Sequence, residues 1–191
     1  MIIVLEGVDG VGKTTIARKL ADSLPLSTLL KLSGSPKKVD DTSFMQSTYN
    51  SLIPFLIELG NKAEIVMDRS WVSELVYSPV FKSYDPESYL KEIINNLHEE
   101  VEVHYILLTL KEEELEKRIE SKKEVQPNEV HIKMENAKKI MRGYDKWFKD
   151  YSPKHPHNYW ILPVDGLSVD EAVKGIIKFI GLEGLYSDAY C

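Results

Sequence analysis

The sequence lacks the features on which several classes of protein depend. It holds a single cysteine, Cys191, so no disulfide can form within the chain and a zinc site built from cysteines is excluded. No apolar run approaches the roughly 18 residues that a membrane-spanning helix needs, and residues 1–6 lack the basic start of a signal peptide. We therefore expect a soluble protein of the reducing cytoplasm.

Basic residues are also in deficit. The 24 lysines and arginines stand against 30 acids, and the net charge of −6 argues against general nucleic-acid binding as the main activity. Hydrophobic residues make up 43% of the chain and charged residues 28%, which is the balance of a globular protein. Because no linker or repeat divides the 191 residues, we expect a single domain over residues 1–191.

Apolar runs alternate with helical patterns along the whole chain. Residues 2–5 form a short, β-branched run that is typical of a strand buried on both faces of a parallel sheet. Strand-like runs recur at 27–32, 63–67, 101–110 and 159–162, and helical patterns lie at 14–24, 42–59, 70–81, 86–99, 111–122, 128–150 and 168–181. The alternation predicts a three-layer α/β fold, in which helices cover both faces of a five-stranded parallel sheet.

A glycine-rich segment follows the first predicted strand. Residues 7–14 read GVDGVGKT and fit the phosphate-loop pattern G-x-x-x-x-G-K-[ST]. The glycines let successive N–H groups point at phosphate oxygens, and the next helix adds its partial positive charge. Lys13 is placed to reach the β- and γ-phosphates, and the Thr14 hydroxyl to ligate Mg²⁺. The segment predicts a nucleoside triphosphate site made of Gly7, Gly10, Val11, Gly12, Lys13, Thr14 and Thr15.

A second motif ends the third predicted strand, where Asp68, Arg69 and Ser70 follow an apolar run. An acid at this point can hold Mg²⁺ through water, and the adjacent arginine lies beside the transferring phosphoryl group, a layout typical of a small-molecule kinase. The alternative is a helix N-cap with a structural arginine. A GTPase is not favoured, because the nearest match to its base-reading N-K-x-D motif, residues 61–64, ends in Glu64.

Together these motifs resemble the thymidylate kinase family of nucleoside monophosphate kinases. Residues 6–15 (EGVDGVGKTT) look like the family's E-G-x-D-G-x-G-K-T-T opening. Residues 68–70, with Ser73 and Tyr77 at the matching spacings, resemble its D-R-Y…S…A-Y-Q segment. Further similarity lies in residues 103–118, in Tyr144 and in residues 162–166.

The resemblance implies roles for the residues at matching positions. Lys13 and Thr14 would serve ATP and Mg²⁺, with Asp68 as a further metal ligand; Asp9 would meet the sugar hydroxyl of the acceptor, and Arg69 would clamp the acceptor phosphate. Lys13, Arg69 and Asp9 would form the catalytic set, and the acceptor site would comprise Asp9, Arg69, Ser73, Glu74 and Tyr77. A helical lid would span about residues 119–132, with Arg118 stacked on adenine and with Lys122 and Lys123 supplying the positive charge that Gly10 does not. The family also implies a homodimer.

The sequence departs from the family in its acceptor half. The R-E-P-G-G segment expected near Lys31 is absent, Ser70 replaces a tyrosine, and the chain has four arginines in all. Two acceptors therefore stay open: a deoxynucleoside monophosphate, with dTMP the first choice, or a hydroxyl group on a nucleoside or on a modified base in DNA. A hydroxyl acceptor requires a carboxylate base, for which Asp9, Glu6 and Glu74 are the candidates. A nucleotide-binding regulator without turnover is a third hypothesis.

Three sets of residues have two interpretations each. Glu74 is either part of the acceptor site or an exposed acid on a helix. The charge-dense stretches 111–124 and 133–149 are either solvated helix faces or a basic cover over phosphates, and the second stretch would have to bind any polynucleotide acceptor. Core packing or stacking on an acceptor base is expected for the aromatic residues Phe44, Phe55, Trp71 and Tyr77.

Overall fold

The computed structural model describes residues 1–32, 42–82, 85–125, 133–151 and 157–185. Its five strands are β1 (Ile2–Glu6), β2 (Ser27–Lys31), β3 (Glu64–Asp68), β4 (Val103–Thr109) and β5 (Tyr159–Pro163). All of them run parallel in a single sheet with the order β2-β3-β1-β4-β5. The predicted five-stranded parallel sheet is therefore confirmed.

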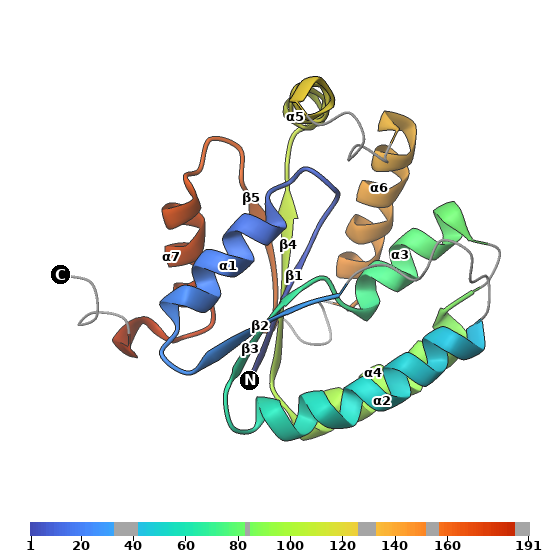
Figure 1. The fold of residues 1–191 in the computed structure, drawn as a ribbon, viewed down its shortest axis with the longest axis vertical. Helices are drawn as coiled ribbons and strands as arrows, with labels where there is room; N and C mark the ends of the chain where they lie inside the picture. The colour runs from blue at the N-terminus through green and yellow to red at the C-terminus, as the bar shows by residue number, and fades with distance from the viewer. Residues whose placement is uncertain (33–41, 83–84, 126–132, 152–156, 186–191) are drawn as a thin grey trace.

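Helices cover both faces of the sheet. They are α1 (Lys13–Ser23), α2 (Thr42–Gly60), α3 (Trp71–Phe81), α4 (Glu87–Glu100), α5 (Glu112–Val125), α6 (Met134–Tyr151), α7 (Val169–Phe179) and the short 3-10 helix η3 (Glu183–Leu185). Figure 1 shows α1 and α7 together on one side of the sheet, and α3 and α6 with the α2–α4 pair on the other. The three-layer prediction is confirmed, with each predicted helix present.

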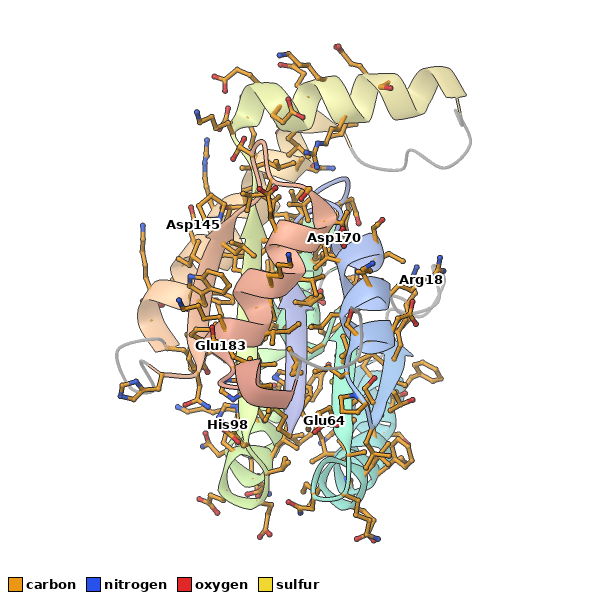
Figure 2. All side chains as sticks on the ribbon, turned by 90° about the vertical axis from the view of Figure 1, so that its left-hand side faces the viewer. Arg18, Glu64, His98, Asp145, Asp170 and Glu183 are labelled. Carbon is orange, nitrogen blue, oxygen red and sulfur yellow. The ribbon has the colours of Figure 1, made fainter. Side chains whose placement is uncertain are left out.

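Two helix boundaries bear on the site. The helix predicted from residue 14 begins one residue earlier, at Lys13, directly after the glycine-rich segment. The lid expected at 119–132 coincides in residues 119–125 with the end of α5, and residues 126–132 lie outside the described part of the chain. Figure 2 shows α5 lying across the end of the molecule, above the carboxyl ends of the strands.

The core is continuous through the central strand. Residues Ile2 to Leu5 of β1 have no exposed surface, because helices pack against both faces of the sheet. Ile16 and Leu20 of α1 are buried on one side of the sheet, and on the other side Tyr105 of β4 packs against Trp71 of α3 and Trp147 of α6. Among the described residues, no helix has the length and apolar character that crossing a membrane requires.

Candidate active site

The candidate site lies at the carboxyl edge of the sheet, where the chain leaves neighbouring strands in opposite directions. From β1 the chain passes through α1 toward β2, whereas from β3 it passes through α3 and α4 toward β4 on the other side of β1 (Figure 1). In open parallel sheets such a switch point leaves a crevice beyond the strand ends, and ligands bind there. The strand pairing sets Leu5, Asp68 and Lys31 side by side at this edge.

The glycine-rich segment takes a backbone path that side chains would obstruct. Gly7 has a φ of 143°, and a Cβ atom placed on it would lie 2.5 Å from the carbonyl oxygen of Leu108. Gly12 is the N-cap of α1 in the left-handed region, with a φ of 107° and with no side chain capping the helix. The first N–H groups of α1 are therefore presented without a side-chain competitor, as a phosphate site requires.

Lys13 is folded back onto this segment. Its Nζ donates hydrogen bonds to the carbonyl oxygens of Gly7 (2.7 Å) and Val8 (2.8 Å), and the residue is 5% exposed. Burial, together with the nearby charge of Arg69, lowers the pKa of the Lys13 ammonium to about 7. The lysine is thus held within the loop at a point where an anion would stabilise its charged form.

Thr14 and Asp68 bring the two sequence motifs together. The Thr14 hydroxyl donates to Asp68 Oδ2 at 2.6 Å, and Lys31 Nζ lies 3.9 Å from the same oxygen. A hydroxyl beside a carboxylate is the hard oxygen donor pair that Mg²⁺ takes in nucleotide sites, where phosphate oxygens and water complete its octahedron. The chemistry of the two residues therefore fits a Mg²⁺–nucleotide complex.

Arg69 stands next to this pair with its guanidinium held on three sides. It forms an ion pair with Asp9, donates to Ser73 Oγ at 3.2 Å and lies 4.7 Å from the centre of the Tyr77 ring. Its backbone is in the left-handed region, with a φ of 78°, which a side chain larger than glycine adopts only under local strain. The Tyr77 hydroxyl also approaches Asp9 Oδ2, at 3.4 Å. Four of the five predicted acceptor residues therefore form one cluster.

Glu74, the fifth, does not match the interpretation of an exposed helix acid. It is 6% exposed, and its Oε1 accepts hydrogen bonds from Ser78 (2.9 Å) and Lys82 (2.9 Å). The pattern of α3 alone does not show this, because Lys82 lies two turns further along and past the end of the helix. The acid is therefore a buried member of an ion pair.

Glu6 is the site residue whose role the sequence did not reveal. Considered only as a candidate base, it is completely buried, and its two oxygens accept four hydrogen bonds, from the Ser70 N–H, the Ser70 hydroxyl, Ser73 and Tyr144. A carboxylate so occupied has no lone pair directed at a substrate. Ser70 also caps α3 through Val72, so the N-cap interpretation of this motif is confirmed alongside its place in the site.

The four aromatic candidates for base stacking differ in how far their side chains are buried. Trp71 is fully buried and packs edge-on against Tyr105, so it belongs to the core. Phe44 and Phe55, both on α2, are about half exposed, at 46% and 53%. Of the four candidates, only Tyr77 contacts the residues of the site.

Helix α5 packs over the glycine-rich segment. Arg118 donates to the carbonyl oxygen of Val11 at 3.2 Å and pairs with Glu114, so it lies against the glycine-rich segment. A Cβ on Gly10 would meet Leu115 at 3.4 Å and would sit on a φ of 92°, so an arginine there would be strained. Thr15 is exposed at the start of α1, whereas the side chains of Lys122 and Lys123 fall outside the described part.

Charged side chains of the stretches 111–124 and 133–149 form ion pairs with one another. Lys138 of α6 forms an ion pair with Glu112 of α5 at 2.6 Å, and Lys139 pairs with Glu135 at 2.7 Å. These are exposed contacts of the kind that solvated helix faces make. They favour that interpretation over a basic cover.

Comparison with solved structures confirms the predicted fold. The YorR protein of Bacillus subtilis, solved in complex with phosphorylated GDP, superposes with a TM-score of 0.71 at 22% identity, over 97% of this chain and 98% of that one. Thymidylate kinase from Candida albicans gives 0.61 at 17% identity over 97% and 93%. Deoxyadenosine kinase from M. mycoides, with the products dCMP and dCDP bound, gives 0.61 at 16% identity over 94% and 98%. No family model and no curated protein matches the sequence. The chain thus has the P-loop kinase fold of these proteins over nearly its whole length.

Proposed function

We propose that the protein is an ATP-dependent kinase that phosphorylates a deoxynucleoside monophosphate, with dTMP as the first candidate. The observation that carries the proposal is the hydrogen bond from Thr14 to Asp68, because it joins the triphosphate loop to the strand end whose next residue is Arg69. A metal and a γ-phosphate held at that bond would lie beside the arginine. Structural neighbours that include a thymidylate kinase and a deoxyadenosine kinase support the same class of reaction. Such a kinase would work in the cytoplasm, where ATP is supplied.

The carboxylates of the site favour a phosphate over a hydroxyl as acceptor. Glu6 has its oxygens fully occupied, Glu74 is paired with Lys82, and Asp68 accepts from Thr14. A phosphate oxygen is ionised at neutral pH and needs no base, whereas a hydroxyl needs one. The cations Arg69 and Lys31 at the same edge suit a second phosphate group.

A hydroxyl acceptor is the second candidate, and one observation favours it. The Asp9 side chain is 48% exposed and faces the site, so it is the described carboxylate best placed to take a proton. For that role it would have to leave its ion pair with Arg69. A deoxynucleoside would be the acceptor in this case, or a modified base in DNA.

The proposed mechanism rests on alignment and charge neutralisation. The N–H groups at the start of α1 and the Lys13 ammonium would hold the β- and γ-phosphates, and Mg²⁺, held by Thr14 and Asp68, would neutralise their oxygens. Arg69 would leave Asp9 in part to hold the acceptor phosphate in line with the γ-phosphate, and Asp9 would turn to the acceptor sugar. Arg118 would lie along the adenine.

The test is ADP release from Mg-ATP, measured across the deoxynucleoside monophosphates and the matching free nucleosides. We expect turnover with one or more monophosphates. Turnover with nucleosides alone would move the assignment to the second candidate. If ADP release stays at background with the whole panel and with DNA, the kinase proposal is wrong.

Nucleotide binding should take up a proton on Lys13. At about pH 8 a lysine with a pKa near 7 is mostly neutral in the free protein, and the negative triphosphate would raise that pKa and draw a proton in. At about pH 6 the lysine is already charged, so uptake is small, and affinity should weaken by up to about tenfold per pH unit above 7. Calorimetry in buffers of different ionisation heat measures the uptake. The control Lys13→Arg, which stays protonated, should show none; equal heats for the native protein in all buffers at pH 8 would contradict the prediction.

A further inference from the structure

The buried carboxylate of Glu6 is held mainly by neutral donors from two distant helices. Ser70 and Ser73 lie at the start of α3, and Tyr144 lies on α6, 138 residues after Glu6 in the sequence. Each donor is at 2.7–2.8 Å, the length of a charge-assisted hydrogen bond. The described part of the chain shows no cation bonded directly to Glu6, so these donors stabilise its charge.

Three of the oxygens form a closed triangle. Ser73 Oγ lies 2.7 Å from Glu6 Oε2, Tyr144 Oη lies 2.8 Å from the same oxygen, and the two hydroxyl oxygens are 2.9 Å apart. Two hydroxyl protons serve the three contacts. Because both hydroxyls donate to Glu6 Oε2, the contact between the two hydroxyl oxygens has no proton of its own, and Ser73 Oγ keeps lone pairs that can accept from another donor.

Those lone pairs are where Arg69 is anchored. Its NH1 donates to Ser73 Oγ at 3.2 Å. Tyr144 supports a second contact of the same guanidinium, because its ring packs edge-on against Tyr77, with centroids 6.3 Å apart, and the Tyr77 ring lies under Arg69. Tyr144 therefore touches two of the groups that hold the arginine, Ser73 and Tyr77.

We propose that Tyr144 is a positioning residue for Arg69. Its hydroxyl fixes the direction of the Ser73 hydroxyl at Glu6, and its ring supports the ring of Tyr77. Removing the Tyr144 hydroxyl takes one of the two donors from Glu6 Oε2 in a site closed to solvent and leaves Ser73 as the hydroxyl bonded to that oxygen. Ser73 is then drawn toward Glu6, which weakens its already long contact of 3.2 Å with Arg69 NH1. The guanidinium then loses its fixed direction toward the acceptor. The expected effect on acceptor kinetics rests on the proposed function, whereas the positioning of the Arg69 guanidinium by Tyr144 does not.

The kinetic test is a double-mutant cycle between Tyr144→Phe and Arg69→Ala. We expect Tyr144→Phe to lower kcat/KM for the acceptor about tenfold in the native background and by less than about twofold in Arg69→Ala, because a residue that acts through Arg69 has nothing left to position. The affinity for ATP should not change. An equal loss in both backgrounds, or a parallel loss of ATP affinity, would overturn the proposal.

Tyr105→Phe is the matched control. Tyr105 is also fully buried, and its hydroxyl bonds with Trp71 (3.2 Å) and His98 (2.7 Å), away from Arg69. We expect the control to leave acceptor kinetics unchanged, even though it also removes a buried hydroxyl.

An independent readout uses the ¹⁵N–¹H signal of the Arg69 Nε group, assigned by its absence in Arg69→Ala. Tyr144→Phe should shift or broaden this signal, and Tyr105→Phe should not. If the native protein turns over no acceptor, the proposed function fails, and the signal still decides the positioning role. An unchanged signal in Tyr144→Phe refutes it.

Discussion

Lys13→Ala is expected to lower ADP release from Mg-ATP at least about a thousandfold, because it removes the one side chain of the glycine-rich segment that would carry positive charge to the β- and γ-phosphates. In the structure the ammonium donates to the carbonyls of Gly7 and Val8, so it lies within the loop where the phosphates would bind. A steady-state assay with saturating acceptor measures the loss.

The substitution should leave the fold intact. The carbonyls of Gly7 and Val8 lose a donor, but a buried ammonium whose charged form is disfavoured is removed as well. The two effects offset each other, so we expect a small change in the free energy of unfolding. Lys19→Ala is the matched control, because Lys19 lies on the same helix, is half exposed and pairs with Asp170. Thermal unfolding should give similar midpoints for both variants, and only Lys13→Ala should lose turnover. Activity retained in Lys13→Ala would refute the assignment of this loop.

Arg69→Ala has the second largest expected effect, a loss of about 2–4 kcal/mol of transition-state stabilisation. The arginine is the side chain next to the Thr14–Asp68 pair, and its planar fork suits two phosphate groups at once. Alanine keeps a Cβ at the φ of 78°, so the backbone strain is the same in both proteins and the difference reports the guanidinium. The measurement is kcat/KM for the acceptor.

Two further variants sharpen this result. Arg69→Lys keeps the charge and loses the fork, and we expect it to recover only a small part of the activity. Arg142→Ala removes an arginine from the exposed face of α6 and should have no effect. If Arg69→Ala and Arg142→Ala behave alike, Arg69 has only the structural role that its place beside the N-cap Ser70 also allows.

The sequence was informative wherever a feature is local. The run of residues 2–5 predicted β1, since a strand buried on both faces has to be apolar at every position. The glycines before Lys13 predicted a loop of unusual backbone, and Gly7 and Gly12 have the positive φ values that glycine permits. Asp68 could be expected near the glycine-rich loop because the parallel strands β1 and β3 end at a shared edge, and in the structure it bonds with Thr14 at the start of α1.

The sequence left two interpretations open where a residue's partner lies outside its own helix or strand. Glu74 reads as an exposed acid in the pattern of α3, and its burial follows from how α3 packs and from Lys82 beyond the helix end. For Trp71 both core packing and base stacking were open, and its contact with Tyr105 of β4 makes it a core residue. Neither contact follows from the spacing of residues within one element.

By itself, then, the sequence determined the α/β class, the order of elements and the glycine-rich loop before α1, because strand and helix periods and glycine turns are set by neighbouring residues. Only the tertiary structure decided the chemical state of the site: the buried and weakly basic Lys13, the saturated Glu6 and the anchoring of Arg69 by Ser73 and Tyr77. Desolvation and hydrogen-bond partners depend on which surfaces of the helices and strands pack together. This packing brings Tyr144 to Glu6 although 138 residues separate them, and no local sequence pattern predicts such a contact.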